Sequence, residues 1–67
     1  MSEMIHNQLQ AARMAAGLSE YEVAECVGLS PAKYQDFEDG KATPPSQILI
    51  KLGQALNVRV AYFFGQL

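Results

Sequence analysis

The chain has 67 residues, a formal net charge of −2 and a single cysteine, Cys26. One cysteine excludes an internal disulfide and favours a reduced, cytoplasmic setting. No apolar run approaches the roughly 20 residues that a membrane span needs, and the first residues lack the order of a signal peptide. The acidic balance is not typical of nucleic-acid-binding domains, which are normally basic.

Helix signals dominate the sequence, and strand signals are absent. Apolar or small residues recur at steps of three and four from Ile5 to Ala16, which predicts a first helix over residues 4–16 with Gly17 as a left-handed stop. Ser19 and Glu22 have the spacing of a capping box, which predicts a second helix over 19–27. Its expected buried side consists of Val23, Ala24 and Val27.

Three further helices follow. Ser30 as N-cap and Pro31 in the first position predict a helix over 30–39. Its apolar residues, Tyr34 and Phe37, are expected to face the core. Thr43 is predicted to cap a helix over 44–56, whose apolar stripe is Ile48, Leu49, Leu52 and Leu56. A short helix over 59–64 would bring Phe63 and Phe64 against the core, and would leave Tyr62 and Leu67 for contact with a second copy.

Five short helices separated by glycine or asparagine predict a compact all-α domain that includes the whole chain, 1–67, in which the second and third helices meet through a tight turn. The sequence then resembles the lambda-repressor-like helix-turn-helix domains of the Cro and phage-repressor (XRE) family from Leu9 to Phe64. The matching motifs are Leu18-Ser19-Glu20, Val23-Ala24, Val27-Gly28-Leu29-Ser30, Phe37-Glu38-Asp39-Gly40, Thr43-Pro44-Pro45 and Ala55-Leu56-Asn57-Val58.

The resemblance implies a sequence-specific DNA-binding transcriptional regulator that acts as a homodimer with the helix over 30–39 in the major groove. The base-reading positions that it implies are Pro31, Ala32 and Asp36, with Lys33 and Gln35 nearby. The candidates for phosphate contact are Ser19, Glu20, Ser30, Lys41 and Thr43, although Glu20 stands where the family usually carries a glutamine. The family also implies an ion pair between Arg13 and Glu38. The alternative is that these two are unrelated surface charges.

The charge of this stretch leaves a second function open. Residues 19–41 contain two lysines against six acidic residues, which disfavours strong binding to phosphates. The alternative function is an acidic protein-interaction module that keeps the fold, has lost or weakened DNA binding, and contacts a protein partner through Asp36 and Asp39. We expect no enzyme, cofactor or metal site, because His6 and Cys26 lie on different predicted helices without a third partner. His6 is expected to face solvent.

Overall fold

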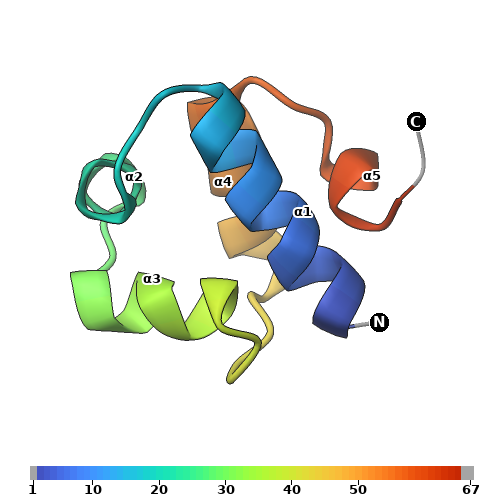
Figure 1. Ribbon diagram of the computed structural model, residues 1–67, viewed down its shortest axis with the longest axis horizontal. Helices are drawn as coiled ribbons and strands as arrows, with labels where there is room; N and C mark the ends of the chain where they lie inside the picture. Colours follow the sequence, from blue (N-terminus) through green and yellow to red (C-terminus); the bar gives the residue numbers. More distant parts are fainter. Residues whose placement is uncertain (1, 66–67) are drawn as a thin grey trace.

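The computed structural model describes residues 2–65 and arranges them as five helices (Figure 1). These helices are α1 (Ser2–Ala15), α2 (Glu20–Val27), α3 (Pro31–Glu38), α4 (Ser46–Leu56) and α5 (Val60–Phe63). No strand occurs among the described residues, and the predicted all-α fold is confirmed. Within the same range, no helix combines the length and the apolar character that crossing a membrane requires.

The N-terminal ends of α2 and α3 form as the sequence predicts. The Ser19 hydroxyl accepts a hydrogen bond from the Glu22 backbone N–H, and the Glu22 carboxylate accepts one from the Ser19 N–H, at 3.1 and 2.8 Å. The Ser30 hydroxyl likewise accepts from the Lys33 N–H at 3.2 Å. These side chains satisfy donors that the first turn of a helix leaves free, so local sequence is enough to set both helix starts. Gly28 ends α2 with φ +75°.

The predicted start of the fourth helix is wrong. Thr43 does not cap it: α4 begins at Ser46, and the residue before it, Pro45, is extended at φ −68° and ψ 164°. The reason is steric, since a residue that precedes a proline is driven out of the helical region, and both Thr43 and Pro44 precede one. Pro44 is buried instead. The apolar stripe itself is as expected, with Leu49, Leu52 and Leu56 buried and Ile48 half-buried.

The helices enclose one core. Helix α2 packs on α3 and α4, and α1 packs on α3 and α5. Figure 1 shows α3 lying across the lower side of the molecule, with α1 above it and α5 beside α1. The largest fully buried side chains come from all five helices and are Leu9, Val23, Tyr34, Phe37, Leu52 and Phe63. The expectation that Tyr34 and Phe37 face the core is therefore confirmed.

The burial of the C-terminal aromatic residues differs from the prediction. Phe63 is fully buried, but Phe64 is 50% exposed and does not close the core. Phe64 follows the last residue of α5, and because adjacent residues point about 100° apart, its ring lies off the face on which Phe63 is buried. Tyr62 is half-buried against the core, with its ring edge-on to that of Phe63 at 5.9 Å between ring centres, so only part of its side chain is left for contact with a second copy. Leu67 lies outside the described residues.

Candidate nucleic-acid interface

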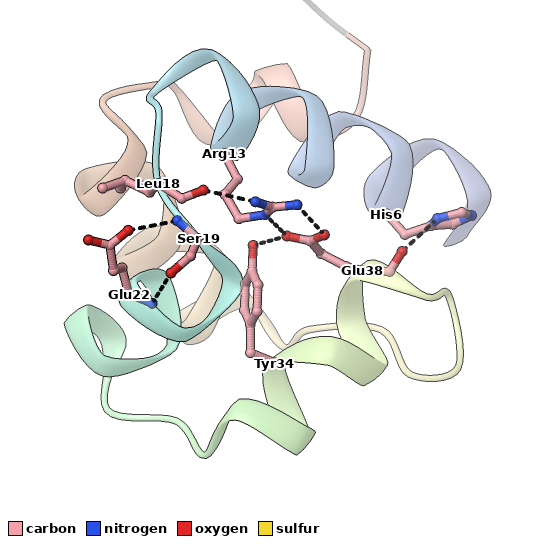
Figure 2. Close-up of polar contacts among 7 residues, drawn as sticks. All are labelled: His6, Arg13, Leu18, Ser19, Glu22, Tyr34 and Glu38. Atoms are coloured by element: carbon pink, nitrogen blue, oxygen red, sulfur yellow. Dashed lines mark hydrogen bonds and ion pairs between the residues drawn. The ribbon is translucent and has the colours of Figure 1, made fainter.

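A buried cluster of polar side chains holds α3 against α1 (Figure 2). Arg13 on α1 donates from Nε to Glu38 Oε2 at 2.5 Å and from Nη2 to Glu38 Oε1 at 3.3 Å. The Tyr34 hydroxyl donates to Glu38 Oε2, also at 2.5 Å. The Glu38 side chain is only 2% exposed and that of Arg13 is 14% exposed. The structure thus contains the ion pair that the sequence implied, and excludes two unrelated surface charges.

The same cluster includes groups that sequence reasoning missed. Arg13 Nη1 donates to the Leu18 carbonyl at 2.8 Å, which ties the turn before α2 to α1 and α3. Tyr34 stands four residues before Glu38 on α3, a spacing that places side chains next to each other on a helix and could have indicated this contact. Burial, and then the hydrogen bond to Glu38, raise the pKa of Tyr34, so its hydroxyl remains a donor.

His6 is half-buried, so the expectation that it faces solvent is wrong. Its Nδ1 lies 3.0 Å from the backbone oxygen of Glu38, and because a carbonyl can only accept, the ring nitrogen donates. The ring rests beside Gly40, where an added Cβ would come within 3.0 Å of His6 Cδ2. Gly40 has φ +78° and lets the chain turn sharply under α1. His6 therefore supports the C-terminal end of α3.

The outer side of α3 presents the residues expected to read bases. Pro31, Ala32, Lys33 and Gln35 are exposed, and Asp36 is half-buried. The Asp36 backbone oxygen accepts hydrogen bonds from the N–H groups of Lys41 and Ala42, so this end of the helix is tied to the loop that follows. The Lys33 ammonium lies 5.8 Å from the centre of the Phe37 ring. The exposed residues of α3 thus lie on one face, mostly in its first turn, while Tyr34 and Glu38 on its opposite face carry the buried cluster.

The expected phosphate contacts lie at two helix starts and one loop. Ser19 and Ser30 are exposed, and each hydroxyl oxygen accepts the cap bond while its O–H can still donate to an anion. Lys41 and Thr43 are exposed in the loop between α3 and α4. Backbone N–H groups at the starts of α2 and α3 add positive partial charge at the same places.

Glu20 lies next to the buried cluster, close enough for Glu38 and Arg13 to act on its carboxylate. Its side chain is half-buried, and this burial is the main cause that raises its pKa. The neighbouring Glu38 carboxylate raises the pKa further, and the Arg13 guanidinium lowers it. The acidity of the helix-turn-helix stretch is also less exposed than the sequence suggests. Glu38 is buried and neutralised by Arg13, and Glu20 is half-buried, whereas Glu22 remains exposed in the cap.

We expect Glu20→Gln to raise the melting temperature slightly at pH 7. If folding raises the pKa of a glutamate, its charged form destabilises the folded protein near neutral pH. This destabilisation disappears as the pH falls through the raised pKa and the carboxylate takes up a proton. The gain should therefore shrink as the pH approaches about 4.3, the ordinary value for glutamate. Thermal melts followed by circular dichroism between pH 4 and 8 measure it. An equal gain from Glu25→Gln, an exposed position on the same helix, would contradict this explanation.

Comparison with known proteins decides the family. A family model described as helix-turn-helix matches residues 9–63, which include the α2–turn–α3 unit and the whole Arg13–Glu38–Tyr34 cluster. The chain belongs to the helix-turn-helix family. Within the part of this helix-turn-helix chain that the structure describes, no group of three or more His, Cys, Asp or Glu side chains could hold a metal ion.

Two solved structures of the clp gene regulator ClgR from Corynebacterium glutamicum are similar to this helix-turn-helix domain. One has a TM-score of 0.87 at 27% identity, and the match covers 94% of this chain and 82% of that one. The other has a TM-score of 0.89 at 27% identity and covers 94% of this chain and 67% of that one. No curated protein matches the chain.

Proposed function

We propose that the chain, as one domain over residues 1–67, is a sequence-specific DNA-binding transcriptional regulator that places α3 in the major groove. The observation that carries the proposal is the pairing of an exposed face of α3 with a buried Arg13–Glu38–Tyr34 cluster on its opposite face. A rigidly held helix can present side chains to base edges in one register. The similarity to ClgR, a gene regulator, supports the same function.

Each exposed side chain of α3 suits a particular base edge. Gln35 can pair with adenine through two hydrogen bonds, and Lys33 can reach guanine or a phosphate. Pro31 and Ala32 offer apolar contact, for instance to a thymine methyl group, and Asp36 can accept from a cytosine amino group. The hydroxyls of the two N-cap serines can donate to phosphates on either side, together with Lys41 and Thr43.

Two features of the proposed complex follow from symmetry and charge. A dimer reads two half-sites about 34 Å apart, and we propose Tyr62 and Leu67 for the contact between copies. Because few lysines face the phosphates, affinity should fall only gently with added salt. The protein would bind its operator in the cytoplasm, where an unpaired, exposed thiol such as that of Cys26 stays reduced.

The test is selection of a binding site from random duplex DNA at low salt, followed by titration of variants on the selected and a scrambled site. Gln35→Ala and Lys33→Ala should each weaken binding to the selected site by roughly 1–3 kcal/mol, and to the scrambled site much less, because they reach base edges. Lys41→Ala should weaken both sites equally and reduce the salt slope by about 1, because it contacts a phosphate.

The matched control is Gln10→Ala, which removes the same side chain from an exposed position on α1 and should change neither titration. A wild-type protein that shows no preference for the selected site at low salt would refute operator binding. If Gln35→Ala lowered affinity for both duplexes equally, α3 would not be reading bases.

A further inference from the structure

Charge is divided unevenly along the chain. All seven acidic residues precede residue 40, and the charged side chains after it are Lys41, Lys51 and Arg59. Helix α4 and the segment that leads to α5 therefore contain cations and no carboxylate. Among the described side chains the one ion pair is Arg13–Glu38, so neither Lys51 nor Arg59 is neutralised within the fold.

A groove of about 480 Å³ lies where α4 ends and the chain turns towards α5. Ile50, Val58 and Val60 line it with aliphatic surface, and Ile50 is 49% exposed although it is a large apolar residue. Arg59 lies among these side chains. The groove therefore places aliphatic surface next to a cation that no carboxylate of the described fold neutralises.

The shape of this groove is built into the backbone. Asn57 adopts the left-handed conformation at φ +59°, which turns the chain back so that the Val58 N–H donates to the Gly53 carbonyl at 2.9 Å. A Cβ at position 53 would lie 2.8 Å from the Val58 carbonyl oxygen, so glycine is needed for this close approach. The groove is thus formed before any partner binds, which lowers the entropic cost of binding.

A second hollow lies beside the first, with Gln54 of α4 between them. It is lined by Lys51, Gln54 and Ala55 of α4 together with Cys26 and Val27 of α2, and Gln54 lines both hollows. No carboxylate and no residue of α3 lines either one. The two hollows together, here called the α4 groove, combine aliphatic surface with Lys51 and Arg59 on a part of the protein separate from the proposed base-reading residues.

We propose that the α4 groove binds an acidic peptide segment of a partner protein. An aliphatic side chain of the peptide packs against Ile50, Val58 and Val60, and its carboxylates pair with Lys51 and Arg59. A second copy of the chain fits less well, because in a two-fold interface the same patch faces itself, and this patch contains two cations and no carboxylate. DNA fits less well too, because phosphates would leave the aliphatic surface uncovered. This inference goes beyond DNA binding and does not depend on it.

The test is titration of the ¹⁵N-labelled protein with a synthetic 12-residue peptide that carries two leucines among glutamates. We expect saturable amide shifts at Ile50, Gln54 and Arg59, and an affinity that falls several-fold as added salt screens the charges. A peptide with lysine in place of glutamate should not bind, and one with serine in place of leucine should bind much more weakly.

Protein variants test whether Lys51 and Arg59 bind the peptide. The double variant with Lys51→Glu and Arg59→Glu should lose binding at least tenfold while its circular dichroism spectrum stays that of the wild type. Gln10→Glu, which adds negative charge on α1, should bind like the wild type. The proposal is overturned if the acidic peptide gives no saturable shifts, or if the lysine peptide binds equally well. It is also overturned if the same amides shift with protein concentration alone, which identifies a second copy, or with duplex DNA.

Discussion

Glu38→Ala is expected to lower the free energy of unfolding by about 3 kcal/mol, because it leaves the Arg13 guanidinium without its charged partner in a site where little water reaches it. The Tyr34 hydroxyl loses its acceptor at the same time. A single core of this size supplies only about 3–5 kcal/mol of net stability, so most of it would be lost. Urea unfolding followed by circular dichroism measures the change, with trimethylamine N-oxide added to keep the variant folded at the start.

Matched variants separate the lost ion pair from the lost packing. Tyr34→Phe removes one hydroxyl and should cost about 1 kcal/mol. Combining Arg13→Met and Glu38→Leu with Tyr34→Phe removes both charges and the hydroxyl that donates to Glu38, and should recover most of the stability that Glu38→Ala loses. If Glu38→Ala were no more destabilising than Glu25→Ala at an exposed position, the cluster would not hold α3 in place.

Phe63→Ala is expected to lower the free energy of unfolding by about 3–5 kcal/mol, whereas Phe64→Ala should change it by no more than about 0.5 kcal/mol. The two residues are adjacent and chemically identical, but Phe63 is fully buried and Phe64 is 50% exposed. The Phe63 ring packs near Gly53 of α4, and α5 also packs on α1, so truncation opens a cavity between three helices.

Thermal unfolding of both phenylalanine variants, with the same stabilising solute, measures this difference. Equal losses would mean that α5 does not close the core in solution. A large loss for Phe64→Ala alone would mean that α5 is turned by one position, since adjacent residues exchange faces when a helix rotates by about 100°.

Sequence alone determined the features that depend on neighbouring residues. The capping box at Ser19, the N-cap at Ser30 and the left-handed stop at Gly17 are all found in the structure, and the glycine and asparagine expected between helices adopt the same conformation at Gly28 and Asn57. A cap satisfies backbone groups two or three residues away, and a positive φ is a property of one residue, so no distant contact is needed to predict either. The late start of α4 is also local, and the Pro44-Pro45 pair could have predicted it.

Tertiary structure decided the features that join distant parts of the chain. His6 reaches the end of α3 across 32 residues, and Arg13 meets Glu38 across 25. The ion pair was foreseen from the family resemblance, while the contact of His6 and the half-buried setting of Glu20 were not. Their positions depend on how α1, α2 and α3 cross. That crossing is set by the packing of the whole apolar core, in which each helix contributes only one face, so no local pattern encodes it.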